Sequence, residues 1–165
     1  MKTRNNLVII LNVIVSILFI IPSFKLDLFA ENYSTLSLTT RGYLYVLFLG
    51  IIIGILLAYE TYKITNNKIK SFIIFLSLFI GCVVPHHVPY NLQGNLHLLF
   101  AYLGFVGLVV ITYLNVLHTK LMNIFVLLIC LVISIYLKYS IVNTLSEIIV
   151  MLTCLYVNAY KYIQC

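Results

Sequence analysis

Histidines and amides gather in one stretch of an otherwise apolar chain. Residues 83–105, VVPHHVPYNLQGNLHLLFAYLGF, contain three of the four histidines: His86, His87 and His97. The neighbouring prolines favour extended backbone, so the adjacent His86 and His87 should point in opposite directions and at most one should join His97. HxxxH and HExxH spacings are absent, so no metal site is predicted. The chemistry open to these residues is hydrogen bonding and proton transfer.

Glu147, in the segment NTLSEIIVML, is the one acid expected inside an apolar helix. An ionisable side chain in a membrane is costly unless it is paired, hydrated or functional. Six residues below the predicted start of its helix, it should lie about 9 Å deep, near the level of His97. A histidine–carboxylate pair fixes one imidazole tautomer and raises its basicity. We predict His97 and Glu147 as a catalytic pair, with a purely structural hydrogen bond as the alternative.

Other polar side chains should complete this site or lie outside it. The predicted ligand-binding residues are His86, His87, Asn91, Gln93, Asn95 and Ser37, and Asn143 could add a hydrogen bond at the same level. Glu60 is expected at the membrane interface, in a solvated ion pair with Lys63. His118 should be a solvated interface residue.

The composition is that of an integral membrane protein. Apolar residues make up 63% of the 165 residues and charged residues 8%, which leaves too little polar surface for a soluble domain. The four cysteines form no CxxC pair, and GxSxG and nucleotide-binding glycine patterns are absent. No disulfide framework or cofactor is therefore predicted.

Apolar runs predict an all-α bundle of about six transmembrane helices in a single domain, 1–165. The predicted helices cover residues 7–21, 43–59, 71–84, 97–117, 121–137 and 141–160. A count of five membrane spans is the main alternative, because only KYS separates the last two. The first segment resembles a secretory signal, but its weak cleavage site and long apolar run favour a retained anchor.

Basic residues predict the orientation of the bundle. An inside amino terminus puts seven of them in the cytoplasm and three outside, namely Lys2, Arg4, Lys63, Lys68, Lys70, Lys120 and Lys161 against Lys25, Arg41 and Lys138. Both termini should thus be cytoplasmic. The net charge of +6 then faces anionic lipid headgroups and does not indicate nucleic-acid binding. The abundance of Ile, Asn, Lys and Tyr is typical of an AT-rich genome and favours a bacterial plasma membrane.

Two further features leave alternatives open. Gly50, Gly54 and Ala58, and likewise Ala101, Gly104 and Gly107, form small-residue patches that favour close helix packing within the chain over a homodimer face. The loop 24–42 could cap the outer mouth of the bundle as a short helix, but a solvated connector is favoured.

The chain resembles a known membrane family in its layout. The segments YSTLSLTTRGYLYVLFLGIIIG, HLLFAYLGF and SEIIVMLTCLYVNAY are similar to the six-span group that includes the FRAG, DRAM and Sfk proteins and related prokaryotic membrane domains. In that group a serine of the first outer loop, a histidine opening the fourth span and a glutamate of the last span recur. The resemblance implies corresponding roles for Ser37 or Ser34, His97 and Glu147, and an association with lipid handling.

We therefore predict an outward-facing polar site that binds or remodels a lipid headgroup, with membrane lipids as the partner. If it is an enzyme, which the sequence leaves open, His97 would be the general base or acid and Glu147 would orient it. The alternatives are a small transporter or proton-coupled permease subunit, and a non-catalytic membrane partner such as an immunity or assembly protein. A homo-oligomer or a partner membrane protein is compatible with each.

Overall fold

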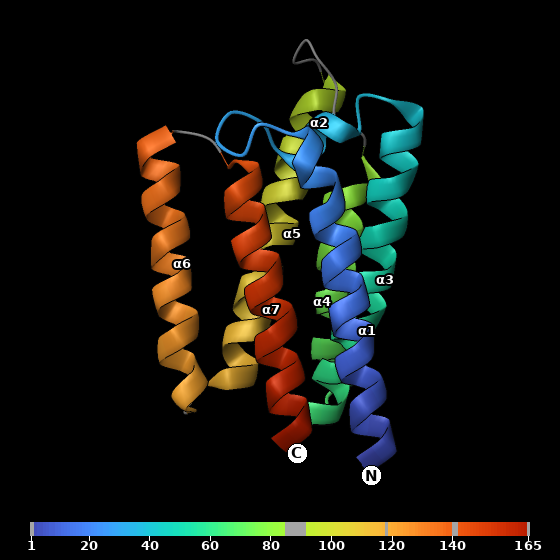
Figure 1. Ribbon diagram of the computed structural model, residues 1–165, viewed down its shortest axis with the longest axis vertical. Helices are drawn as coiled ribbons and strands as arrows, with labels where there is room; N and C mark the ends of the chain where they lie inside the picture. The colour runs from blue at the N-terminus through green and yellow to red at the C-terminus, as the bar shows by residue number, and fades with distance from the viewer. Residues whose placement is uncertain (1, 85–91, 118, 140–141, 165) are drawn as a thin grey trace.

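A computed structural model describes residues 2–84, 92–117, 119–139 and 142–164, and of residues 2–5 the backbone alone (Figure 1). The protein is all-α and 88% helical, and the described residues contain no strand. In chain order the elements are α1 (Lys2–Ile20), the 3-10 helix η1 (Ile21–Lys25), α2 (Tyr33–Leu36), α3 (Thr40–Thr65), α4 (Lys68–Val83), α5 (Leu92–Val116), α6 (Lys120–Tyr139) and α7 (Thr144–Gln164). Each of the six long helices overlaps one predicted from the apolar runs.

The boundary between the last two helices is clear. α6 ends at Tyr139 and α7 begins at Thr144, and the two run antiparallel side by side (Figure 1). Asn143 accepts hydrogen bonds from the Ser146 backbone N–H at 3.0 Å and from the Ser146 hydroxyl at 2.9 Å, so it caps the start of α7. α6 and α7 are therefore two separate helices.

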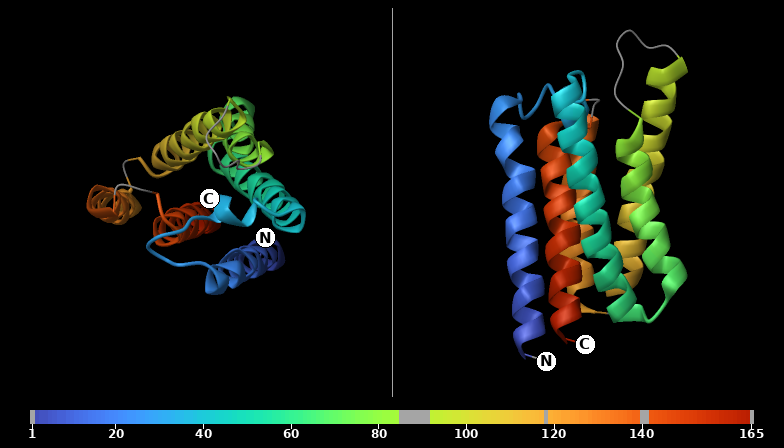
Figure 2. Two further views of the ribbon diagram at one scale, coloured as in Figure 1. Left: turned by 90° about the horizontal axis from the view of Figure 1, so that it is seen from above. Right: turned by 90° about the vertical axis from the view of Figure 1, so that its right-hand side faces the viewer.

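The bundle has two distinct ends. Both termini lie at one, together with the α3–α4 connection, and α2 lies at the other (Figures 1 and 2). We call them the termini end and the α2 end. α7 packs against α1, α3, α5 and α6, while α6 contacts only α5 and α7 extensively. Polar side chains on α7 can thus meet partners from several helices.

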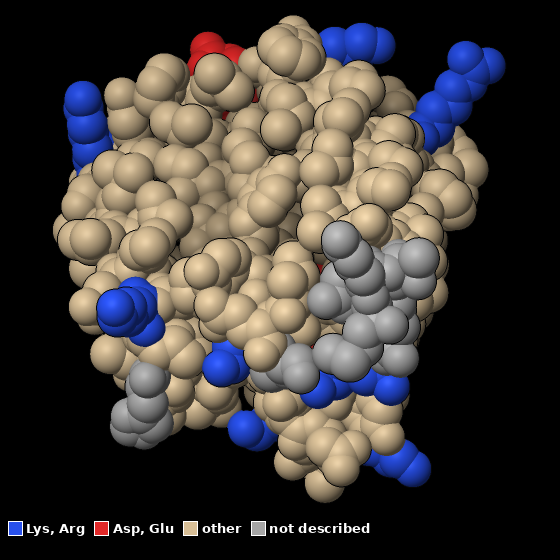
Figure 3. All heavy atoms as spheres, turned by 60° about the horizontal axis from the view of Figure 1, so that its bottom comes forward, with Lys and Arg blue, Asp and Glu red and all other residues tan. Residues whose placement is uncertain are grey.

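The outer surface is that of a membrane protein. Four segments are long and apolar enough to cross a membrane: Asn6–Lys25, Thr40–Thr65, Leu92–Val116 and Leu121–Tyr139. Large apolar side chains point outward along them, for example Leu103 and Leu127 with 56% and 69% of their surface exposed. Lysines and arginines gather toward the termini end, while most of the visible surface carries no charge (Figure 3). Such an apolar exterior needs lipid around it.

Small residues bring α4 close to both of its neighbours. A Cβ atom added at Gly50 would lie 2.6 Å from the Cys82 sulfur, and one at Gly104 would lie 2.3 Å from the Ser77 carbonyl oxygen. Both distances are shorter than a real Cβ contact. At Gly104 the neighbour is backbone, so only glycine permits α4 and α5 to approach as they do, whereas at Gly50 the Cys82 side chain would have to shift. The prediction that these small residues serve packing within the chain is confirmed.

The segment between α1 and α3 is not the solvated connector that the sequence favoured. It forms η1 and α2, and α2 lies over the end of the bundle (Figure 2). The Thr144 backbone N–H donates to the Glu31 carbonyl at 2.7 Å, and the Leu145 N–H donates to the Leu28 carbonyl at 3.1 Å. The loop therefore satisfies free donors at the start of α7, which is why it folds back onto the bundle.

Candidate functional site

A cavity of about 150 Å³ lies beneath α2, between α3, α4, α5 and α7, and is partly open to the surface. Its polar lining comes from Tyr33, Ser34, Ser37, Ser77, His97 and Glu147. Its apolar lining includes Leu49, Ile53, Leu108 and Val150. From His97 to Leu108 the lining follows eleven residues of α5, or about 16 Å along the helix. The polar lining is therefore concentrated near α2, and the deeper lining is mainly apolar, with Ser77, whose hydroxyl donates to the Ile73 carbonyl at 2.8 Å, as the polar residue at the depth of Gly104.

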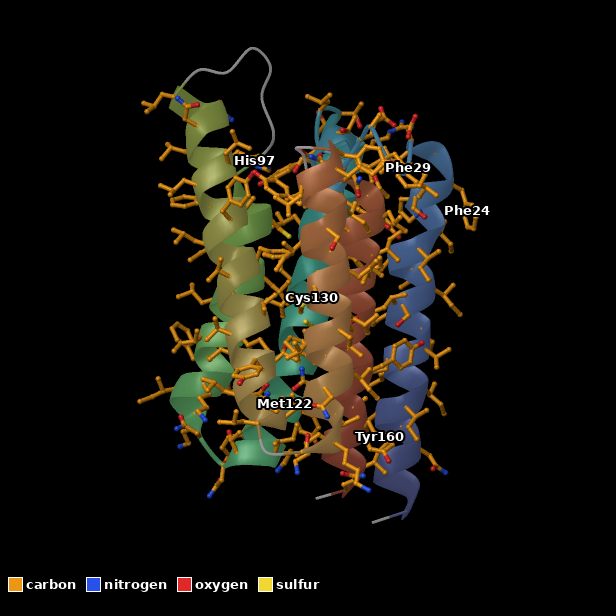
Figure 4. The ribbon with its side chains drawn as sticks, turned by 90° about the vertical axis from the view of Figure 1, so that its left-hand side faces the viewer. Phe24, Phe29, His97, Met122, Cys130 and Tyr160 are labelled. Carbon is orange, nitrogen blue, oxygen red and sulfur yellow. The ribbon has the colours of Figure 1, made fainter. Side chains whose placement is uncertain are left out.

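His97 lies in the second turn of α5 with only 4% of its surface exposed, at the same end of the molecule as Phe29 (Figure 4). Its Nδ1 is 2.6 Å from the Val84 carbonyl oxygen, and its Nε2 is 2.8 Å from the Ser34 hydroxyl. A carbonyl oxygen can only accept, so Nδ1 carries a proton. In the neutral ring, Nε2 then accepts the hydroxyl proton of Ser34. This is the relative placement of a general base and an alcohol nucleophile.

Glu147 lies in the first turn of α7, three residues after the helix begins at Thr144. The sequence had predicted a position six residues after the helix start. Its Oε2 accepts a hydrogen bond from the Tyr33 backbone N–H at 2.7 Å. Asn32, the N-cap residue of α2, makes no side-chain cap of its own. Glu147 thus caps α2 from another helix. Its side chain is half-buried, because it also borders the cavity.

Tyr33 attaches α2 to α1. Its ring stacks on Phe19 with centroids 4.4 Å apart, and its hydroxyl donates to the Phe19 carbonyl oxygen. Burial raises the pKa of this hydroxyl, which keeps it a protonated donor. The Ser37 hydroxyl donates to the Ser34 carbonyl at 2.7 Å. α2 is therefore held by α1, α5 and α7 together.

His97 and Glu147 share this cavity, and the hydrogen bonds above connect them through neighbouring residues of α2. Glu147 accepts a hydrogen bond from the Tyr33 backbone N–H, and His97 is hydrogen-bonded to the Ser34 hydroxyl. A direct contact between the two side chains remains a prediction. Ser34 is the serine that contacts His97, and Ser37 supports it from the next turn.

The other predicted site residues fall outside this cluster or outside the described residues. His86, His87 and Asn91, with the prolines around them, and His118 are not among the described residues. Gln93 and Asn95 are exposed on the first turn of α5 and do not line the cavity. Asn143 is fully buried as the cap of α7. A ligand-binding role for Gln93 and Asn95 stays a prediction, and they are placed outside the cavity because helix geometry turns them toward the surface.

Glu60 is not a solvated interface residue. It is 0% exposed, and its Oε1 accepts a hydrogen bond from the Asn12 amide of α1 at 2.6 Å. Lys63, the expected partner, is exposed and lies over the rings of Tyr59 and Tyr62, 5.7 Å and 5.3 Å from their centroids. The predicted ion pair is wrong because α1 covers this face of α3, a packing that helix periodicity alone did not reveal.

A network of buried amides and hydroxyls adjoins Glu60. The Asn115 amide donates to the Thr61 hydroxyl at 2.9 Å and to Asn158 Oδ1 at 2.8 Å. Asn158 in turn donates to the Thr112 hydroxyl at 3.2 Å. Sequence reasoning missed this cluster, although Thr112 and Asn115 stand three residues apart on one helix face, which was the available signal.

An apolar layer separates the two polar regions. On α3, Ile53 and Leu57 lie between the cavity and Glu60, and on α7, Val150 and Cys154 lie between Glu147 and Asn158. At most 2% of the surface of each of these four side chains is exposed. Eleven residues separate Glu147 from Asn158, about 16 Å along the helix. Along α3 and α7, these apolar side chains therefore separate the two polar clusters. Thr153 is the polar residue of this stretch of α7, and its hydroxyl donates to the Ile149 carbonyl at 2.6 Å.

No protein-family model, no curated protein and no solved structure matches this chain.

Proposed function

We propose that this protein binds the headgroup end of a membrane lipid in the cavity beneath α2. The observation that carries the proposal is the division of one cavity into a polar part, with Ser34, His97 and Glu147, and an apolar part along α5. A lipid is divided in the same way, into a polar headgroup and an apolar chain. Small-molecule sites are generally concave and mainly apolar, with a few placed polar groups.

The size of the cavity limits what it can hold. A void of about 150 Å³ accommodates a group about as large as benzene. One small headgroup, or a short length of one acyl chain, fits this space, whereas a whole lipid does not. The remainder of the ligand would then lie against the apolar outer surface.

We further propose six membrane spans with both termini in the cytoplasm of a bacterial cell. By this orientation the α2 end, with Lys25, Arg41 and Lys138, faces outward, and the other seven basic positions face the cytoplasm. The cavity would then take lipid from the outer leaflet. The resemblance to FRAG, DRAM and Sfk proteins supports the same site, since its serine, histidine and glutamate correspond to residues of this cavity.

Lipid retained during purification in mild detergent tests the proposal. We expect Glu147→Gln to lower the lipid bound per protein, measured by mass spectrometry, by roughly two- to tenfold, the loss expected for one hydrogen bond. Glutamine can still accept from the Tyr33 N–H, so α2 should stay in place. Ala101→Leu fills the cavity without touching its hydrogen bonds and should also lower retention.

Glu31→Gln is the matched control, because Glu31 makes a local bond to the Asp27 N–H and does not line the cavity. Its lipid content should equal that of the wild type. Thermal unfolding of every variant reports whether the fold is kept. Undiminished lipid in folded Glu147→Gln and Ala101→Leu would contradict the proposal.

A second candidate function, transfer or hydrolysis of a lipid acyl group, is favoured by the tautomer of His97. As the Ser34 oxygen bonds to the carbonyl carbon of a lipid ester, its proton would pass to His97 Nε2, and the ring would then protonate the departing alcohol. The Val84 carbonyl would hold Nδ1–H throughout. Water would release the acyl group from Ser34 by the same steps in reverse.

A fluorophosphonate probe, which reacts with activated serines, distinguishes catalysis from binding alone. We expect a phosphonate adduct on Ser34, located by peptide mass spectrometry, and its loss in Ser34→Ala and in His97→Ala. Ser37→Ala should keep the adduct, because the reacting Ser34 hydroxyl is bonded to His97, while the Ser37 hydroxyl donates to the Ser34 backbone carbonyl. An unlabelled wild type that still retains lipid would reject catalysis and leave the binding proposal intact.

A further inference from the structure

We propose that Glu60 and Asn12 form a proton-binding site at the termini end of the bundle, in which Glu60 is a neutral carboxylic acid. The site is independent of the cavity beneath α2, from which the apolar layer separates it. The ligand is a single proton, shared between one carboxyl group and one amide.

The evidence begins with oxygen atoms that lack donors. Three buried side-chain atoms of the described residues have no hydrogen-bond partner: Asn12 Oδ1, Glu60 Oε2 and Asn115 Oδ1. Two of them belong to the same bonded pair, in which Asn12 Nδ2 donates to Glu60 Oε1 at 2.6 Å. Only 1% of the surface of Asn12 and none of that of Glu60 is exposed. A buried acceptor without a donor is costly, so a donor is missing from this pair.

One proton supplies that donor to both atoms. A primary amide and a carboxylic acid can join through two parallel hydrogen bonds, N–H to carbonyl oxygen and O–H to amide oxygen. The first of these is present. The two atoms that the second would join, Glu60 Oε2 and Asn12 Oδ1, are the two left unpartnered. The other amide proton of Asn12 is already used, since Nδ2 also donates to the Val8 carbonyl at 3.0 Å.

The surroundings offer Glu60 no counter-charge. The ionisable groups near this end on the packed helices are Tyr59, Tyr62 and Lys63 on α3, Lys68 and Lys70 on α4, and Tyr160, Lys161 and Tyr162 on α7. Among the described side chains of α1, from Asn6 onward, none ionises. Within the described part of the chain, Glu60 accepts a hydrogen bond from Asn12 and makes no ion pair. An ionised carboxylate here would be buried without compensation.

Glu60→Gln is the sharpest test, because glutamine reproduces the neutral acid. Its amide can donate to Asn12 Oδ1 while its oxygen accepts from Asn12 Nδ2. We expect its melting temperature at pH 7 to equal or exceed that of the wild type. Asn12→Leu removes the amide that pairs with both carboxyl oxygens of Glu60, and it should lower the melting temperature by roughly 4–10 °C.

The pH dependence has a defined sign. A proton held by folded Glu60 is lost from the unfolded chain above about pH 4.3, so the unfolded state binds fewer protons and rising pH favours unfolding. The unfolding equilibrium constant of the wild type, relative to that of Glu60→Gln, should rise about tenfold per pH unit from about pH 5 until Glu60 ionises. Glu31→Gln, which alters a carboxyl of the surface loop, should keep the wild-type dependence.

Infrared spectroscopy observes the proton directly. The wild type should show the carbonyl stretch of a protonated carboxylic acid at pH 7, shifted in D₂O and weaker in Glu60→Gln by the contribution of one carboxyl group. A Glu60→Gln variant as unstable as Asn12→Leu, or lacking any spectral difference from the wild type, would overturn the proposal. So would stabilisation of the wild type by sodium chloride over choline chloride that Glu60→Gln abolishes, since the ligand would then be sodium.

Discussion

Alanine in place of Gly104 is expected to destabilise the protein by about 3 kcal/mol, at the upper end of the usual cost of overpacking. The added Cβ would lie 2.3 Å from the Ser77 carbonyl oxygen and 3.2 Å and 3.3 Å from the backbone N and Cα of Gly81. These are backbone atoms of α4, which cannot turn aside as a flexible side chain can. Relief requires α4 and α5 to move apart, and the wall of the cavity moves with them.

Gly81→Ala is the matched control for this variant. It lies on the opposite helix of the same contact, yet a Cβ at Gly81 would meet nothing within 4 Å. Because alanine is the better helix former by roughly 1 kcal/mol, Gly81→Ala should be neutral or slightly stabilising. Reversible unfolding in a denaturing detergent gives both values. Equal stability of the two variants would show that α4 and α5 do not pack as closely as described.

Leucine in place of Asn158 should cost about 3 kcal/mol, because Asn158 is the centre of the buried amide network. It is 0% exposed, accepts from Asn115 and donates to Thr112 and to the Cys154 carbonyl. Leucine fills a similar volume but leaves these groups without a partner, at roughly 1–3 kcal/mol for each group that finds no other. The melting temperature should fall by roughly 6–12 °C.

A double variant and a surface control make this prediction specific. Adding Asn115→Leu removes the donor that Asn158→Leu strands, so part of the lost stability should return. Asn123→Leu makes the same substitution at an exposed position of α6 and should be near neutral. Strictly additive losses in the double variant would mean that the two amides do not interact.

The positions of the helices could be predicted because their signals are local. Long apolar runs demand helices in a membrane, since the backbone must satisfy its own hydrogen bonds there. The prolines and polar residues from Pro85 onward marked the end of α4, which comes at Val83. The loop 24–42 was misjudged because the groups that hold it, at the start of α7, are more than a hundred residues away.

Two residues that line the cavity were singled out from the sequence. His97 and Glu147 stood out because ionisable residues are rare and costly in apolar helices, and both line one cavity. Glu60 was assigned to solvent because a lysine follows it three residues later, a spacing that suits an ion pair on a helix surface. The structure buries that surface under α1, so the same residue becomes part of the interior.

The sequence by itself determined the all-α class, the helix boundaries to within six residues and the apolar exterior, since these depend on composition and on contacts within each helix. Only the tertiary structure decided which polar groups meet. Asn12 and Glu60 are 48 residues apart, Ser34 and His97 are 63 apart, and Tyr33 and Glu147 are 114 apart. Such pairs depend on the rotation of each helix about its axis, and α2 and the glycine contacts of α4 set that rotation through packing.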